Sequence, residues 1–334
     1  MTRVWTGTSE AALEPTLKSR DTYGMTTLLL SHDACLDHQT FVGHPESPAR
    51  LRAVLDALSG PRFDALEREE APRASVEDIA RVHPRSHVED LLASMPTKGI
   101  THIDADTIMS PGSGEAALRA AGAVCRAVDA VASGQAQNAF CAMRPPGHHA
   151  EPQTPMGFCL FNNVAVGALY AREKYGLQKA AVIDFDVHHG NGTQAMFEAD
   201  ENLFYASTHQ SPLYPGTGDA SETGVGNIVN VPLRQGADGR EFRTAYEKVI
   251  LPALRAFDPE ILFISAGFDG HAEDPLAGLN LTEPDYVWVT KELMGVAQNA
   301  CEGRIVSTLE GGYDLGALAR SASAHVATLM GTGV

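Results

Sequence analysis

The chain has 334 residues, of which 44% are hydrophobic and 20% are charged, which is typical of a globular protein that can bury a sizeable core. Its 42 acidic and 25 basic residues give a formal net charge of -17, which disfavours nucleic acid as a partner because phosphates bind to basic surfaces. No apolar run reaches the roughly 18 to 20 residues of a membrane span, and the N-terminus lacks a signal-peptide core, so we expect no membrane partner.

The predicted elements begin after residue 24. Residues 1–24 show no sustained periodicity, and we expect them to form a loose N-terminal extension. From there, short apolar runs alternate with helical patterns. The expected strands are 26–33, 138–144, 179–187, 202–208, 227–233, 260–267 and 303–312, and the expected helices are 47–60, 115–134, 162–176, 241–257 and 283–301.

Apolar strands separated by helices are typical of a parallel sheet that is buried on both faces. The predicted fold class is therefore α/β, with a central parallel β-sheet covered by helices on both faces. No internal repeat, low-complexity tract or Pro/Ser-rich linker divides residues 25–334, so we expect them to form a single domain.

Five cysteines are scattered along the chain and none forms a Cys-x-x-Cys pair: Cys35, Cys125, Cys141, Cys159 and Cys301. This odd number argues against a disulfide scaffold and against a thiolate zinc cluster. The pattern fits a reducing compartment, and we expect a cytoplasmic location. Composition says nothing about assembly, so a homo-oligomer stays open.

Polar clusters follow four of the predicted strands, at the carboxyl ends where ligands bind in sheets of this kind. They are RPPGHH at 144–149, DFDVHHGN at 184–191, AGFD at 266–269 and EGGY at 310–313. Taken alone, a His-His pair, an Asp-x-Asp or a Gly-Gly-Tyr turn is often structural, and we expect His44, His83, His87 and His102 to be structural. Four strand ends that all carry reactive residues point instead to one site.

The ligand types in these clusters favour a metal. Period-2 alternation along the predicted strand would place Asp184, Asp186 and His188 on one side. Asp and His without Cys favour zinc or another divalent transition ion at a catalytic site, with Asp186, His188 and Asp269 as ligands and a position left for water. The sequence therefore predicts metal-assisted hydrolysis of an amide or ester.

Two further side chains are expected to orient imidazoles. Asp184 is placed to accept the ring N–H of a histidine, and Asn191 to do the same for the second histidine of the 148/149 pair. A neighbouring histidine would then take the proton of a water whose pKa zinc lowers toward about 7.

Seven motifs, in this order, resemble the zinc-dependent histone deacetylase superfamily: RPPGHHA, GFCLFNNVAVGA, DFDVHHGNGTQ, YPGTGD, SAGFD, DPLAGLNLT and EGGY. That superfamily includes the acetylpolyamine amidohydrolases and is related in fold to arginase. The likeness runs from about Thr26 to the C-terminus. It is nearest to the class II-like bacterial deacetylases, because Asn191 stands where class I enzymes typically carry Asp. The resemblance implies an arginase-deacetylase fold.

The resemblance also implies roles for individual residues. Asp186, His188 and Asp269 match the zinc ligands. His149 matches the general base, oriented by Asn191, and His148 matches the electrostatic partner or general acid, oriented by Asp184. Tyr313 matches the tyrosine that binds the substrate carbonyl and stabilises the oxyanion. The remaining matches are a substrate tunnel of Gly157, Phe158 and Tyr214 with Leu276 at its rim, Arg50 near the acetate exit, and a potassium site of Asp184, Asp186, His188, Ser207 and Thr208.

Several alternatives stay open at this point. Vertebrate-type polyamine-preferring relatives carry Glu where this chain has Leu276, so the rim favours acyl-lysine or a neutral amide. The loop acid that holds the substrate backbone is either Asp104 or Asp106, and the metal is zinc or iron(II). An acetyl-lysine peptide is the leading substrate and a small acetylated amine, such as an acetylpolyamine, is second. An inactive acyl-lysine binding module is a third interpretation. The dimanganese ureohydrolases are disfavoured because they need additional bridging carboxylates, and SAGFDGHAED lacks the Asp-x-Asp that they use.

Overall fold

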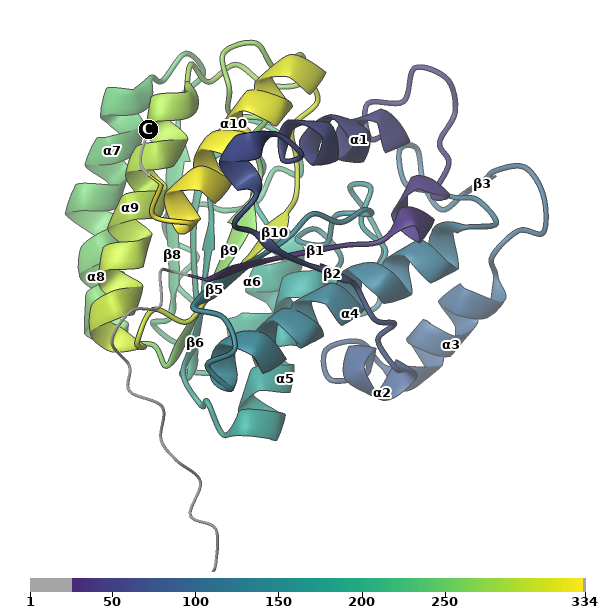
Figure 1. The fold of residues 1–334 in the computed structure, drawn as a ribbon, viewed down its shortest axis with the longest axis horizontal. Coiled ribbons are helices and arrows are strands. Elements are labelled where there is room, and N and C mark those ends of the chain that lie inside the picture. The colour runs from purple at the N-terminus through teal and green to yellow at the C-terminus, as the bar shows by residue number, and fades with distance from the viewer. Residues whose placement is uncertain (1–25, 333–334) are drawn as a thin grey trace, which may run out of the picture.

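Eight parallel strands form one sheet through the middle of the protein in the computed structural model, which describes residues 26–332 (Figure 1). Their order is β2-β1-β5-β10-β9-β6-β7-β8, and every pairing is parallel. The strands are β1 (Thr27–Ser31), β2 (Glu67–Glu70), β5 (Asn138–Cys141), β6 (Ala180–Asp184), β7 (Leu203–Gln210), β8 (Ile228–Leu233), β9 (Ile261–Ala266) and β10 (Ile305–Leu309). A separate antiparallel pair joins β3 (Thr101–His102) to β4 (Ile108–Met109). The expected extension, residues 1–24, lies outside the described residues.

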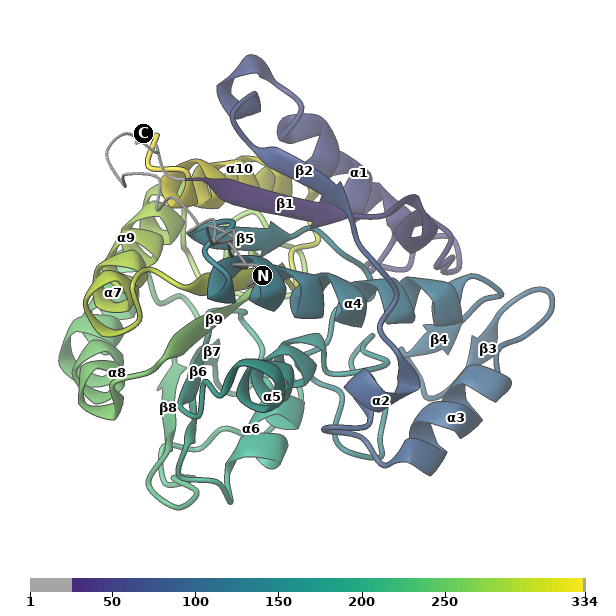
Figure 2. The ribbon, with the colours of Figure 1, turned by 60° about the horizontal axis from the view of Figure 1, so that its bottom comes forward.

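Helices cover both faces of this sheet (Figure 2). One side carries α2 (Val76–Ile79), α3 (Arg85–Ala93), α4 (Ser113–Ala132), α5 (Asn163–Tyr175) and α6 (Asn191–Phe197). The other side carries α1 (Pro48–Ala57), α7 (Gly239–Ala245), α8 (Leu251–Phe257), α9 (Glu283–Ala300) and α10 (Leu315–Leu329). The predicted fold class is confirmed. Within residues 26–332, no helix combines the length and the apolar character that crossing a bilayer requires.

Burial on both faces explains why the central strands are recognisable in the sequence. All residues of β5, β6, β9 and β10 are buried, and most of them are apolar. The edge strand β2 has the sequence EREE and is largely exposed, so it carries no apolar pattern and was not predicted. Charged residues on an edge strand also discourage pairing with another chain.

The helix predicted over 241–257 is present and helical throughout, but its interior is not a regular α-helix. The structure divides this segment into α7, a π-helical turn (Tyr246–Ile250) and α8. Pro252 lies in the first turn of α8 and has no N–H to donate to the preceding turn, so the regular hydrogen-bond pattern is interrupted there. Helices α6 and α10 were not predicted. The helix α10 is buried over most of its surface, so its sequence lacks a clear polar face.

The strand predicted to reach residue 187 ends at Asp184, so the predicted alternation through His188 is wrong. After Asp184 the chain turns. The Phe185 N–H donates to the Ser265 carbonyl (3.2 Å), and the Asp186 N–H donates to the Asp184 carboxylate (3.1 Å). This turn, and not the pleat of a strand, therefore directs the side chains of Asp186 and His188.

Close packing of α5 on the sheet depends on Gly167. A Cβ at this position would lie 2.3 Å from Val124 Cγ1 of α4 and 3.0 Å from Phe263 Cε1 of β9. We expect Gly167→Ala to lower the free energy of unfolding by about 1–3 kcal/mol, because the extra methyl group overpacks this contact. In the control Gly295→Ala on α9, the Cβ meets nothing within 4 Å, so helix propensity should raise stability by about 0.5–1 kcal/mol. Urea unfolding measures the free energy of unfolding of both variants. A change of the same sign in Gly167→Ala and Gly295→Ala would contradict the explanation from packing.

Candidate active site

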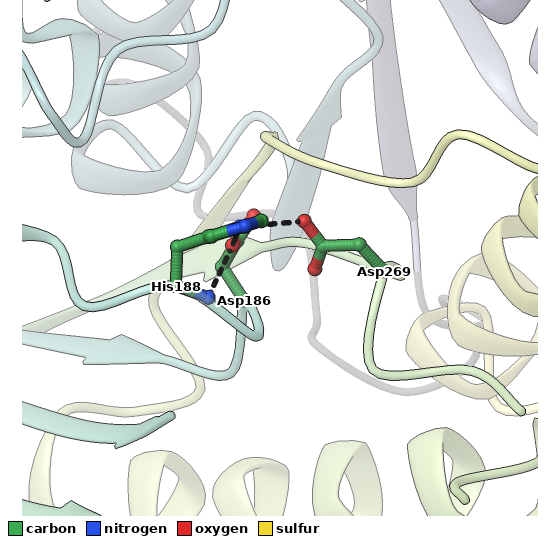
Figure 3. Close-up of side chains that lie close together, drawn as sticks. All are labelled: Asp186, His188 and Asp269. Carbon is green, nitrogen blue, oxygen red and sulfur yellow. Dashed lines mark hydrogen bonds and ion pairs between the residues drawn. The ribbon is translucent and has the colours of Figure 1, made fainter. Parts of the chain in front are cut away.

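Asp186, His188 and Asp269 meet where the neighbouring strands β6 and β9 end (Figure 3). His188 Nδ1 lies 3.0 Å from Asp186 Oδ1 and 3.1 Å from Asp269 Oδ2. One potential ligand atom from each of the three residues lies within 4.8 Å of the others. The structure thus brings together the three residues that the sequence analysis selected as metal ligands.

Backbone N–H groups hold both carboxylates of this cluster in place. Asp186 accepts hydrogen bonds from the N–H groups of Gly311 (2.8 Å) and His188 (2.8 Å), and Asp269 accepts one from Val187 (2.9 Å). The close approach requires glycine, because a Cβ at Gly311 would lie 2.0 Å from Asp269 Oδ2. The motif EGGY therefore contributes a glycine as well as a tyrosine to the site.

The cluster is buried and attracts cations. Burial opposes a charge on His188, but Asp186 and Asp269 outweigh it and raise the pKa of His188 to about 10. Burial and the charge of Asp186 raise the pKa of Asp269 to about 7. A proton shared in this cluster neutralises part of the negative charge of the two carboxylates. A divalent metal ion would neutralise more of that charge. The donor set of two carboxylates and one imidazole fits such an ion.

The tandem histidines lie beside this cluster, and each ring donates to one oxygen. His148 Nδ1 lies 2.9 Å from Asp184 Oδ2, and His149 Nδ1 lies 2.8 Å from Asn191 Oδ1. The centroids of the two imidazoles are 4.0 Å apart. These are the partners that the sequence analysis assigned to the two histidines.

The two histidines differ in charge although they are adjacent. Burial opposes a charge on His148, but Asp186 and Asp184 outweigh it and raise its pKa to about 10. Burial and the nearby His148 and His188 hold the pKa of His149 well below its usual range. At neutral pH, His148 is therefore charged and His149 is neutral, with Nδ1–H on Asn191 and Nε2 free to accept a proton.

Arg50 supports the turn that carries Tyr313. Its guanidinium donates to the carbonyl oxygens of Glu310 and Gly312, pairs with Glu46 at 3.2 Å and lies 4.8 Å from the centroid of the Tyr313 ring. The N–H of Tyr313 donates to a carboxylate oxygen of Asp274 (2.7 Å). Arg50, which the resemblance placed near an acetate exit, is fully buried and contacts the backbone on both sides of Gly311.

Aromatic rings lead from the cluster toward the surface. The Tyr214 ring meets the His149 ring edge-on at 5.2 Å and is 38% exposed, while the Phe158 ring meets the Tyr313 ring at 5.8 Å. Gly157 has a positive φ of 55°, and a Cβ there would lie 2.5 Å from His149 Cδ2. Leu276 is 37% exposed and donates its N–H to Asp274, the residue that also holds Tyr313.

Asp104 and Asp106 differ in what their carboxylates do. Asp104 accepts from the N–H groups of Asp106 (2.9 Å) and Thr107 (2.6 Å), so it closes its own turn. The Asp106 carboxylate accepts only from the hydroxyl of Thr107 (3.0 Å) among the described residues. Burial and the neighbouring Asp104 raise its pKa, and its charge contributes to the raised pKa of Tyr214. Asp106 is therefore the freer acid, and it lies near the aromatic rings.

Of the residues expected to bind potassium, Asp186 and His188 belong to the cluster, and Asp184, Ser207 and Thr208 lie on the neighbouring strands β6 and β7. Asp184 and Ser207 are partners in the register of β6 and β7, and both are fully buried. The Ser207 hydroxyl contacts His209 Nδ1 (2.9 Å), and the Thr208 hydroxyl has no hydrogen-bond partner among residues 26–332.

Sequence reasoning gave no role to Glu310, which the structure places against the tandem histidines. Its Oε2 accepts from the N–H groups of Gly147 (2.7 Å) and His148 (3.2 Å). Burial raises the pKa of this carboxyl to about 7. Only the position of Glu310 in EGGY marked it beforehand, because contacts between residues 147 and 310 are long-range.

Glu310 makes stability depend on pH in a direction that can be tested. Its pKa rises from an ordinary value of 4.5 to about 7 on folding, so stabilisation by its proton is present below pH 4.5 and lost as pH rises to about 7. Glu310→Gln keeps an acceptor oxygen but does not titrate. We therefore expect the free energy of unfolding of wild type, relative to this variant, to fall by up to about 3 kcal/mol between pH 4.5 and 7. Urea unfolding with a chelator measures it.

The matched control is Glu247→Gln, which removes one exposed carboxylate from the π-helical turn. Between pH 4.5 and 7, the free energy of unfolding of wild type should not fall relative to Glu247→Gln. A fall relative to Glu247→Gln as large as that expected relative to Glu310→Gln would contradict the assignment. The absence of any fall relative to Glu310→Gln would also contradict it.

The chain and its fold are similar to known proteins. The histone deacetylase domain family matches residues 44–329. Histone deacetylase 14, chloroplastic, of Arabidopsis thaliana is 39% identical over 342 residues, covering 95% of this chain and 80% of the relative. A histone deacetylase-like amidohydrolase of Pseudomonas aeruginosa is 40% identical over 279 residues, covering 81% and 73%.

An archaeal relative and a solved structure agree with this assignment. A probable deacetylase of Archaeoglobus fulgidus is 38% identical over 315 residues, covering 92% of this chain and 87% of the relative. The crystal structure of the HDA15 HD domain is similar with a TM-score of 0.88 and 35% identity, covering 92% of this chain and 89% of that one. The family match and these relatives together show that this chain belongs to the histone deacetylase family.

Proposed function

We propose that the protein is a zinc-dependent deacylase that hydrolyses the side-chain amide of acetyl-lysine, with residues 25–334 as its catalytic domain. One observation carries the proposal: a buried Asp-His-Asp cluster lies next to a neutral histidine, with the rings of His188 and His149 5.9 Å apart. Family membership supports a deacetylase or amidohydrolase activity. The specific metal and substrate are the proposed part.

Asp186, His188 and Asp269 would hold the metal. Zinc at these residues supplies Lewis-acid polarisation of the amide carbonyl and acidifies a water molecule. His149 accepts the proton of the attacking water at Nε2, while Asn191 keeps the proton on Nδ1. The water oxygen forms the new bond to the carbonyl carbon.

Two charged or polar groups serve the later part of the reaction. The hydroxyl of Tyr313 donates to the carbonyl oxygen as negative charge develops on it. His148, positively charged beside Asp184, provides electrostatic stabilisation and a proton for the leaving amine. The C–N bond breaks, and the products are acetate and a free lysine side chain.

The surroundings of the site favour acetyl-lysine as substrate. Phe158 and Tyr214, with Gly157 allowing the backbone to approach His149, would form the walls around the lysine methylenes. Leu276 at the rim offers no negative charge for a polyamine tail. Asp106 is the acid that would accept N–H groups of the peptide backbone, because the carboxylate of Asp104 closes its own turn.

A potassium ion would complete the support of the zinc cluster. The proposed ligands are oxygen atoms of Asp184, Asp186, His188, Ser207 and Thr208. Within residues 26–332, no hydrogen bond outside the regular elements is accepted by the carbonyl oxygens of Asp186 and His188. Free carbonyl oxygens in a buried turn are suitable ligands for a hard cation.

Five buried free cysteines support the proposal of a reducing, cytoplasmic location.

A small-molecule amidohydrolase, such as an acetylpolyamine deacetylase, is the second candidate, and the relative from Pseudomonas aeruginosa is named an amidohydrolase. Acetate release from an acetyl-lysine peptide and from acetylputrescine, each with zinc-loaded and chelator-treated protein, separates the two. We expect chelator-sensitive turnover of the peptide, restored by zinc, and little turnover of acetylputrescine. Turnover of acetylputrescine alone would favour the second candidate. Binding without turnover of either would indicate an acyl-lysine binding module.

Tyr313→Phe tests the mechanism at one atom. Removing the hydroxyl should lower kcat by about 10²–10³-fold, because one oxyanion donor is lost, while the ring keeps its contacts with Phe158 and Arg50. Zinc content and the midpoint of urea unfolding serve as controls and should match wild type. Full wild-type turnover in this variant would contradict the proposed role of Tyr313.

A further inference from the structure

A second pocket, of about 430 Å³, lies directly beside Tyr313. It is formed by residues 40–45, 47 and 48 on one side and by Tyr313 and Leu315 on the other. None of its lining residues is an acid, a lysine or an arginine, although the chain carries a formal net charge of -17. The volume falls within the range of small-ligand pockets, and the lining favours an uncharged group.

Exposed apolar side chains gather around this pocket. Val42 is 104% exposed, Phe41 is 44% exposed and Leu315 is 42% exposed, and all three line it. Phe41 is held in place by stacking on His102, with the ring centroids 6.2 Å apart. An apolar patch of this kind on a surface marks a place where another molecule binds.

The pocket borders the candidate active site at Tyr313. Tyr313 lines it, and the ring of His44 lies between Phe41 and Phe158, at centroid distances of 4.9 and 5.0 Å. His44 is buried and held by the carbonyl oxygens of Glu46 (2.9 Å) and Asp106 (3.0 Å). A substrate with its acetyl-lysine between Phe158 and Tyr214 thus has a neighbouring residue within reach of the pocket, since adjacent Cα atoms are about 3.8 Å apart.

We propose that this pocket is a specificity subsite that binds an apolar side chain of a residue adjacent to the acetyl-lysine in a peptide substrate. The inference rests on the proposed function and extends it from an acetylated lysine to its sequence context. A charged side chain would lose hydration in this pocket without gaining a counter-charge. An apolar side chain would cover Phe41, Val42 and Leu315 and remove their surface from water.

Peptides with leucine or glycine next to the acetyl-lysine, on either side of it, test the proposal with zinc-loaded full-length protein. We expect kcat/KM to be about tenfold higher with leucine on one side, a preference that partial burial of one leucine side chain can provide. Val42→Asp should reduce this preference to about one to threefold and leave turnover of the glycine peptide within twofold of wild type. Val42 is fully exposed, so this change should not affect folding.

The matched control is Val249→Asp, an exposed valine in the π-helical turn, which should retain the wild-type preference. Equal turnover of leucine and glycine peptides by wild type would overturn the subsite while leaving the deacylase proposal intact. An equal loss for both peptides in Val42→Asp would also overturn it. A glycine peptide with a longer acyl group, preferred by wild type but not by Val42→Asp, would assign the pocket to the acyl chain instead.

Fluorescence anisotropy with labelled peptides and the Tyr313→Phe protein separates the subsite from the chemistry. We expect the Tyr313→Phe protein to bind the leucine peptide more tightly than the glycine peptide. Loss of this preference when Val42→Asp is added would support the subsite, even if wild type hydrolyses no peptide. That combination would reject the deacylase function alone. No turnover and no binding preference would reject both.

Discussion

The whole site depends on keeping two carboxylates, Asp186 and Asp269, buried side by side at the ends of β6 and β9. Their mutual repulsion and lost hydration would destabilise the fold if they were left unpaired. The structure offsets this cost with the imidazole of His188 and with backbone N–H groups of Val187, His188 and Gly311. A cation in the same place would complete the compensation, so the energetic requirement of the fold and the metal chemistry coincide.

The negative charge of these carboxylates also affects the pKa values of the tandem histidines, His148 and His149. Asp186 and Asp184 outweigh burial and raise the pKa of His148 to about 10, whereas burial and the nearby His148 and His188 hold the pKa of His149 well below its usual range. One acid and one base thus arise from identical side chains 4.0 Å apart. Glu310 accepts hydrogen bonds from the backbone N–H groups of Gly147 and His148, and burial raises the pKa of its carboxyl to about 7.

The mouth of the site is shaped by loops that reach it from distant parts of the sequence. Arg50 links residues 46–50 to the turn that carries Tyr313, and His44 links the same loop to Phe158. These contacts place an apolar pocket and an aromatic tunnel next to each other. Under the proposed function, this arrangement would supply two places for a substrate to bind, one for the acetyl-lysine and one for a neighbouring residue of the peptide.

The sequence by itself determined the fold class and predicted that Asp186, His188 and Asp269 would come together. Fully buried strands are apolar throughout, and parallel strands bring their carboxyl ends to one edge, so clusters at residues 144–149, 184–191, 266–269 and 310–313 had to converge. Only the tertiary structure decided where β6 ends, how Asp186 and His188 are aimed, which acid at 104 or 106 is free, and that Glu310 and the pocket beside Val42 exist. Those features arise from contacts between residues far apart in the chain, and local periodicity contains no information about such contacts.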